Sequence, residues 1–581
     1  MLRDIDTKTG TSGVAFTTKN MKTEIDFQQR KGKFEANDEN AYVDFPINKY
    51  RAFSDKLDWD MDKNDIELRV KKGKEKEGFR FVSTKPEQDS LHFNAEYALF
   101  KASEKVLYSE KVKYIDIADS RVVLGDGKVV VRDDARMDSL HNTTILMPAE
   151  KPYHTLKKGN VGISGRFAIG GNAIYEYKDK TGRVQNIRMN TIRVDSVRQM
   201  RAKGVITAAD SLKFMPNVSY KGDFNLFSKN PEPFVKGYIT LDHDCPLLSR
   251  RWMETEGFIG DGNIMIPVPA EARDEQKNIM FNGFAFASDS SGIYPVLISG
   301  KKNYSDQEVV SASGYLAYDV PTGEYRVGSK ERLADADAEG NLMVFKPSDC
   351  SAYGEGKLDL GGKLGQVKTV SAGRINYLPA DTTTELDVVF GINFYMDNSI
   401  WDVIFSKIKD NQSGTKSLSD QTNLKDLAEL IPDKKERARF VSKAGTLDKL
   451  PAELATTFMF TDVHLFWNKK KRSLQHSGPV GILSWNGKFF NRSANLKMEI
   501  ERKRSGDAIQ IYIEFDSGNW YYFNYRNNIM QVYTSHNTDI NNKILELDGG
   551  KRTVEGKNGV PTYQFSLLAG KRRFEQWLQE F

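Results

Sequence analysis

Apolar and polar residues alternate along most of the chain up to about residue 395. Clear runs occupy 42–45, 56–61 and 65–70. A period of two buries one face of a β-strand and leaves the other in water, whereas a helix needs a period near 3.6. Turn-forming residues, such as Asp62 and Asn64, separate the runs. The pattern predicts a mainly β protein of successive antiparallel hairpins, forming β-jellyroll, groove or sandwich modules.

Several hairpins can be placed individually. Three segments share an aromatic-rich strand, a polar turn and a second strand, and they occupy 95–108, 172–184 and 313–327. Their intervals are irregular, so they are not a fixed-period repeat, and any antiparallel protein would produce such hairpins. Gly125, Asp126 and Gly127 separate two valine-rich runs and predict a further hairpin, because glycine accepts the positive φ of tight turns.

Helical spacing appears after about residue 396. Ser399 is the expected cap of a first short helix, and Leu424, Leu427 and Leu430 predict a second that ends near Pro432. A third helix is expected over 436–443, and Pro451 reads as the start of a fourth. Strands resume at 458, and Phe574 and Trp577 predict a docked terminal helix.

These patterns predict four regions. They are a β-hairpin domain over 1–160, a second β-hairpin region over 161–395, a small helical insert over 396–457, and a basic C-terminal β domain with a terminal helix over 458–581.

Composition excludes several classes of protein. The chain has 581 residues, of which 2 are cysteine and 11% aromatic, so it is neither a disulfide-stapled scaffold nor a disordered chain. No apolar run reaches about 18 residues, which predicts no transmembrane helix. No apolar core follows Arg3, so no signal peptide is expected, and strand-like alternation already at Val14 suggests a fragment of a longer chain.

Sequences that imitate ligand loops are better read as turns. The glycines at 257–262 and 361–365 do not fit a phosphate-binding loop. Asp335, Asp337 and Glu339 imitate the front of a calcium loop, but Lys346 stands where a bidentate carboxylate is needed. No cofactor is expected.

One short segment gathers four plausible metal ligands or catalytic groups: Asp242, His243, Asp244 and Cys245. Neighbours on a strand point to opposite faces, and no oxyanion donor or third catalytic residue is identifiable. A loop before Pro246 is the simpler interpretation, so no catalytic or metal residue is assigned. Cys245 and Cys350 could meet in space, and the sequence leaves their pairing open.

A basic stretch is the clearest departure from a near-neutral chain. The net charge of the whole chain is +5, whereas 468–510 holds ten basic and three acidic residues. The basic residues are Lys469, Lys470, Lys471, Arg472, Lys488, Arg492, Lys497, Arg502, Lys503 and Arg504. They could form a surface for an anionic partner such as lipid headgroups or an anionic glycan, or simply charged hairpin tips and edge strands. Nucleic acid ranks last among these partners, since no nucleic-acid module is recognised.

Two family resemblances follow from the hairpins. The segments 22–70 and 96–131 resemble the OstA-like β-jellyroll of lipopolysaccharide-transport proteins. Gly356 to Gly362, followed by the strand 384–390 and the short helix, resembles the tail of AsmA-like envelope proteins. Both resemblances imply a β groove that holds lipid acyl chains in the envelope of Gram-negative bacteria.

The expected function is therefore that of a non-enzymatic cell-envelope protein, periplasmic or at the outer membrane, that binds or bridges lipid or acts as a scaffold. One alternative is a structural component of a larger surface or secretion assembly, with other envelope proteins as partners. Another is an enzyme acting on polysaccharide, which would need a cleft with convergent carboxylates.

Overall fold

The computed structural model describes residues 2–5, 12–70, 78–179, 181–246, 248–259, 264–362, 364–379, 383–408, 418, 420–502, 506–568 and 571–581. Within these residues the fold is mainly β, as predicted, and its sheets are almost entirely antiparallel. The chain divides into two compact units, Met1–Ile239 with Thr255–Ile266, and Thr240–Glu254 with Pro267–Phe581. The four regions expected from the sequence stay a prediction.

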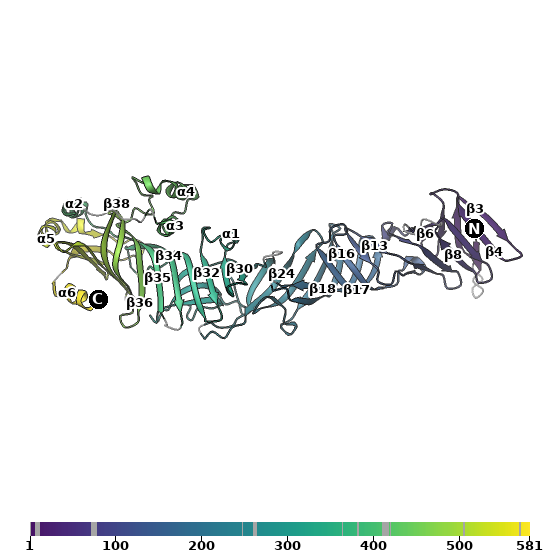
Figure 1. Cartoon of the computed structure of the whole chain (residues 1–581), viewed down its shortest axis with the longest axis horizontal. Coiled ribbons are helices and arrows are strands. Elements are labelled where there is room, and N and C mark those ends of the chain that lie inside the picture. The colour runs from purple at the N-terminus through teal and green to yellow at the C-terminus, as the bar shows by residue number, and fades with distance from the viewer. Residues whose placement is uncertain are drawn as a thin grey trace. The chain divides into compact units, whose positions relative to one another are not determined.

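The N-terminal unit begins with two facing sheets. The first has the strand order β1 (Leu2–Ile5), β2 (Ser12–Lys19), β5 (Tyr42–Phe45), β6 (Tyr50–Phe53), β9 (Phe79–Ser83) and β10 (His92–Ala95). The second has the order β15 (Val129–Val131), β12 (Val106–Glu110), β11 (Tyr97–Lys101), β8 (Asp65–Arg69), β7 (Lys56–Asp60), β4 (Lys31–Ala36) and β3 (Met21–Asp26). Successive hairpins alternate between the two sheets, which places labels such as β6 and β8 close together in Figure 1.

The alternating residues of these hairpins form the core. Val43 and Phe45 of β5 are buried, as are Ile66 and Leu68 of β8, while their neighbours are more exposed. The ring centroids of Phe45 and Phe100 lie 4.9 Å apart and join the two sheets. The period of two thus correctly predicted which side chains face inward.

Two further sheets complete the N-terminal unit. One has the order β13 (Tyr114–Ile117), β14 (Ser120–Val123), β16 (Leu140–Met147), β17 (His154–Gly165), β18 (Ala168–Lys178) and β19 (Val184–Met189). The other has the order β20 (Thr191–Val194), β21 (Met200–Ile206), β23 (Val218–Phe227), β24 (Asn230–Leu241) and β25 (Met253–Phe258), with β22 (Lys213–Met215) beside β23. Tyr177 of β18 contacts Phe214 and Phe224 of the second sheet, so aromatic side chains again fill the space between two sheets.

The hairpins expected at 95–108, 172–184 and 313–327 are confirmed, but the one at Gly125–Gly127 is wrong. β14, before these glycines, pairs with β13 and β16, whereas β15, after them, pairs with β12 of another sheet. Gly127 does adopt the expected positive φ of 67°. The turn chemistry was correct, but the chain passes there from one sheet to another.

The C-terminal unit contains a 15-stranded sheet (Figure 1). Its order is β26 (Ile266–Val268), β30 (Gly314–Asp319), β31 (Glu324–Gly328), β32 (Leu342–Lys346), β33 (Ser351–Leu358), β34 (Lys368–Leu378), β35 (Thr383–Asn393), β36 (Phe458–Asn468), β37 (Ser473–Trp485), β38 (Lys488–Glu501), β39 (Ala508–Asp516), β40 (Asn519–Arg526), β41 (Ile529–Thr534), β43 (Tyr563–Leu567) and β42 (Thr553–Val554). A small sheet of β28 (Ile293–Ser299), β27 (Phe281–Phe286) and β29 (Gln307–Ser311) packs against it through Phe286 and Trp467.

Helices cover both faces of the large sheet. They are α1 (Lys330–Ala334), α2 (Asn398–Lys407), α3 (Gln421–Glu429), α4 (Lys434–Lys443), α5 (Asn537–Glu546) and α6 (Lys571–Glu580). Trp401 of α2 packs on Phe458 of β36, whereas the next residue, Met459, belongs to the core beneath α3 and α4. Figure 1 shows α3 and α4 together beside the strands β32 to β35.

The helical segment corrects two expectations. The cap of α2 is Asp397, whose Oδ1 accepts from the backbone N–H of Ser399 at 2.9 Å, so Ser399 lies inside the helix. Pro451 starts a single turn instead of a helix, because β36 begins at Phe458 and leaves no length for more. The terminal helix is confirmed, with Phe574 and Trp577 buried. No helix among the described residues is long and apolar enough to span a bilayer.

Candidate functional site

The four-residue segment singled out by the sequence has a structural role. The sulfur atoms of Cys245 and Cys350 form a disulfide, so the thiol is not available as a nucleophile. His243 Nδ1 accepts from the backbone N–H of Cys245 at 3.2 Å, and burial lowers the pKa of this imidazole. Asp244 is exposed and pairs with Arg250. The segment is a loop, as its simpler interpretation predicted, and it is covalently fixed to the turn between β32 and β33.

No group of three or more histidine, cysteine or carboxylate side chains with metal-binding geometry is found in the described part of the chain. Two carboxylates that lie shortly before His141 in the sequence are each paired with an arginine instead of with one another. Asp133 pairs with Arg136, and Asp138 pairs with Arg132, so each is neutralised at its own position.

The basic stretch does not gather into one surface. Lys469, Lys470, Lys471 and Arg472 form the hairpin tip between β36 and β37, where Asn468 Oδ1 accepts from two backbone N–H groups. Lys488 and Arg492 lie at the opposite end of β37, a strand of 13 residues. A strand of that length spans roughly 40 Å, so the two groups cannot meet one small ligand. Lys503 and Arg504 lie outside the described residues.

Several of these basic side chains hold the protein's own elements. Lys471 Nζ donates to the carbonyl of Glu580 at 2.9 Å, and a cation there complements the C-terminal end of α6. Lys497 lies over the ring of Phe581 at 5.6 Å, and Lys488 lies over that of Phe405 at 5.1 Å. Arg502 is buried and pairs with Asp507 at 2.7 Å. Several basic side chains of this stretch therefore contact other parts of the protein and are not all free to bind a partner.

A buried network of hydrogen bonds lies beneath α6. Glu499 is 2% exposed, and its carboxylate accepts from Ser473 Oγ at 2.6 Å, Gln475 Nε2 at 2.7 Å and Trp577 Nε1 at 2.7 Å. A buried carboxylate is tolerable only when donors surround it in this way. This network fixes the terminal helix to the sheet and is structural in character.

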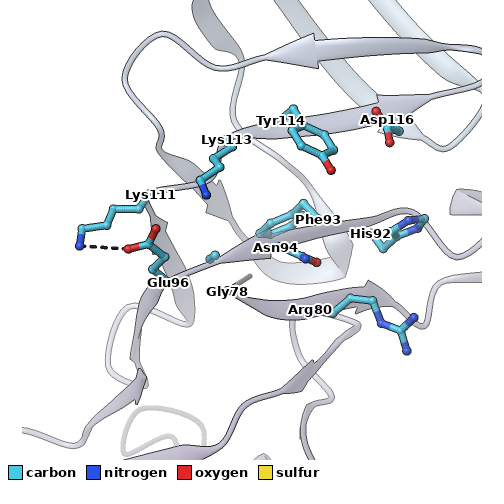
Figure 2. Close-up of a pocket in the computed structure, with 11 residues that line it drawn as sticks. Gly78, Arg80, His92, Phe93, Asn94, Glu96, Lys111, Lys113, Tyr114 and Asp116 are labelled. Carbon is cyan, nitrogen blue, oxygen red and sulfur yellow. Dashed lines mark hydrogen bonds and ion pairs between the residues drawn. The ribbon is translucent and has the colours of Figure 1, made fainter. Parts of the chain in front are cut away.

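A cavity of about 290 Å³ lies in the N-terminal unit where two sheets meet. Figure 2 shows Tyr114 and Asp116 of β13, with Lys113 just before this strand, facing His92 and Asn94 of β10. Each of these strands is the last in the order of its own sheet, and some of their Cα atoms approach within 8 Å. The two exposed edges thereby cover one another, which is one way in which β proteins avoid edge-to-edge association.

The polar groups around this cavity are engaged locally. Lys111 Nζ pairs with Glu96 at 3.2 Å, as Figure 2 shows. The guanidinium of Arg121 lies over the Tyr114 ring at 3.9 Å and binds both carboxylate oxygens of Asp116. The arrangement is a polar seam between sheets, without a nucleophile held by a base.

A second cavity, in the C-terminal unit, combines residues that no sequence motif joined. Phe286, Gly361 and Arg502 line it from three distant parts of the chain. The sequence marked Gly361 and Gly362 only as a turn and Arg502 only as part of the basic stretch, and no spacing linked the two. No known protein-family model matches the chain, and no curated protein has significant similarity to it.

Proposed function

We propose that this protein is a non-enzymatic scaffold of the cell envelope, built from successive β modules that hold or space the parts of a larger assembly. The observation that carries the proposal is the packing between facing sheets. In the N-terminal unit the side chains of Phe45, Phe81 and Phe100 are each 0% exposed and occupy the space between the sheets.

This packing supports the scaffold form over the lipid-binding form. A groove for acyl chains needs apolar surface that stays open along consecutive strands. Here Phe81 stacks on Phe93 at 5.0 Å, and Phe16 contacts Trp59 across the two sheets at 6.2 Å. Interiors packed at such distances resemble those of ordinary globular cores, and they stabilise the modules themselves.

The disulfide supports an extracytoplasmic location. Disulfide bonds persist in oxidising compartments such as the periplasm and the cell surface, and they are rare in the reducing cytosol. The bond between Cys245 and Cys350 closes a loop with a sequence separation of 105 residues. A link across so many residues suits a protein that must stay folded without cytosolic chaperones.

Two measurements on the freshly isolated protein test the proposal. Native mass spectrometry, followed by solvent extraction, should give the mass of the bare chain and no stoichiometric lipid. Thiol titration in denaturant should detect no free thiol before reduction and both cysteines after it. An acyl lipid bound at one copy per chain would contradict the scaffold role and indicate a lipid carrier. Two free thiols before reduction would contradict the extracytoplasmic location.

A further inference from the structure

The second cavity has the size and the wall chemistry of a ligand site. Its volume is about 790 Å³, within the range in which small-molecule sites are found. Ser288 and Ser290 line it from the loop after β27, Ser305 from the turn before β29, Gln307 from the start of β29, and Thr369 from β34. The walls therefore present hydroxyl and amide groups from separate elements toward one space.

A buried ion pair forms one side of the cavity. Arg502 Nη1 donates to Asp507 Oδ2 at 2.7 Å, and the two side chains are 8% and 6% exposed. The guanidinium lies over the Phe286 ring at 4.5 Å. Its Nε and Nη2 atoms are buried and have no hydrogen-bond partner among the described residues. Buried donors without acceptors cost free energy, so a bound molecule that supplied an acceptor would stabilise this guanidinium.

The turn at Gly361 and Gly362 lies directly against this pair. A Cβ atom added to Gly362 would stand 1.6 Å from Asp507 Oδ2, so only glycine fits. Gln307 Nε2 donates to the carbonyl of Gly361 at 2.6 Å and holds the turn in place. The backbone turn and the ion pair thus form a wall whose polar groups are held by hydrogen bonds.

The charges of the described lining residues balance. Arg502 and Lys368 are cations, and Asp359 and Asp507 are anions. Among these described residues an anionic ligand would meet as many carboxylates as cations and would gain little from them. A neutral molecule with many hydroxyl groups can instead donate to the carboxylates and accept from the cations, the amide and the serines.

An exposed aromatic residue is adjacent in sequence to one of the lining residues. Tyr304 is 87% exposed and directly precedes Ser305 in the chain. An exposed ring of this size is accessible for contact with a ligand. The C–H faces of a sugar ring pack well on such a ring, while the phenol keeps its own hydrogen bonds to water.

We propose that this cavity binds a short neutral oligosaccharide, with Arg502, Gln307 and the serines recognising its hydroxyls and Tyr304 supporting one ring at the rim. The site binds sugar without cleaving it. Asp359 Oδ1 accepts from the backbone N–H of Gly361 at 3.0 Å, and Asp507 is held by Arg502. Both carboxylates thus serve the wall itself. The inference does not depend on the scaffold role, because it concerns one cavity within the C-terminal unit.

The test uses the full chain on an array of short neutral oligosaccharides, followed by calorimetric titration with the tightest binder at low and at physiological salt. Tyr304→Ala should weaken binding roughly fivefold to tenfold, the loss expected for one aromatic contact. Ser305→Trp should abolish binding by filling the cavity, and both positions are exposed, so the fold should remain. Tyr153→Ala, at an exposed tyrosine of the other unit, is the matched control and should bind as the parent does.

Binding that is insensitive to salt, weakened by Tyr304→Ala and abolished by Ser305→Trp would support the site. The proposal is overturned if no neutral oligosaccharide binds, or if Tyr304→Ala and Ser305→Trp bind as the parent does. Titration with inorganic phosphate and sulfate tests the alternative that an anion, and not a sugar, supplies the acceptors for Arg502. If only these anions bind, and their affinity falls with salt, the cavity is an anion site and the saccharide assignment is wrong.

Discussion

Removal of the disulfide should destabilise the C-terminal unit by several kcal/mol. Cys245 lies in the segment after β24, and Cys350 lies in the turn between β32 and β33. Their Cα atoms are 5.6 Å apart, although 105 positions separate them in the chain. The bond thus restricts a long stretch of the unfolded chain while it joins two places that already touch in the folded protein.

The magnitude follows from the length of the closed loop. With a separation of 105 residues, the chain-entropy relation gives a loss of unfolded-state entropy of about 16 cal/mol/K, which is about 4.8 kcal/mol at 25 °C. Measured disulfide contributions are commonly about 2 to 4 kcal/mol, because the reduced unfolded chain retains some structure. A decrease of about 2 to 5 kcal/mol in the free energy of unfolding is therefore expected.

The assay compares the parent with the double variant Cys245→Ser/Cys350→Ser in urea. Tryptophan fluorescence reports the unit directly, because Trp401 and Trp485 are buried in it. The midpoint should fall in the variant, and reducing agent should lower that of the parent to the same value while leaving the variant unchanged. Equal midpoints, with the slopes of the two transitions also equal, would refute the loop-closure reasoning.

Three further predictions concern single features of the fold. Trp577→Phe removes the donor to buried Glu499 and should cost roughly 1 to 3 kcal/mol in urea unfolding. Trp467→Phe is the control, since that indole N–H has no partner within the part of the chain that the structure describes, and an equal cost for both would contradict the hydrogen-bond assignment. Burial raises the pKa of Asp426 to about 7 despite Arg374. The folded state then holds a proton that the unfolded state releases, so this residue's contribution to stability declines as pH rises from about 4 to about 7. Asp426→Asn should remove this decline, a difference of at most about 4 kcal/mol at pH 8, and an unchanged pH profile of the urea midpoint would count against it. Finally, valine at the three charged positions of the exposed edge strand β3 should promote self-association, detected by light scattering; a variant that stays monomeric would show that these charges do not protect the edge. The three positions are Lys22, Glu24 and Asp26.

Local patterns predicted the strands because burial of one face is a local requirement. The runs at 56–60 and 65–69 alternate, and they pair as the hairpin of β7 and β8. Sheet membership is different, because it depends on partners far along the chain. Gly125 and Gly127 have the residues of a hairpin turn, yet β14 and β15 find their partners in two different sheets.

The candidate sites were harder to predict for a related reason. Lys471 and Lys488 are close in sequence, but they lie at opposite ends of the long strand β37, beside the turns that precede and follow it. The cavity wall shows the reverse, since Phe286, Gly361 and Arg502 are far apart in sequence and line one space. Neither arrangement produces a fixed spacing of residues that a sequence motif could identify. The disulfide had only one possible pair, yet its formation required two loops to meet.

The alternation of hairpins between the two N-terminal sheets has a consequence for the order of folding. β8 pairs with β11 and β6 pairs with β9, so each hairpin joins one that is only two hairpins earlier in the chain. A chain that emerges from a ribosome or a translocation channel N-terminus first can therefore add one hairpin at a time to a sandwich already begun. Contacts of such short range favour rapid folding and limit the time for which unpaired edges are exposed. This path suits vectorial assembly, in which the leading part is protected before the trailing part has appeared.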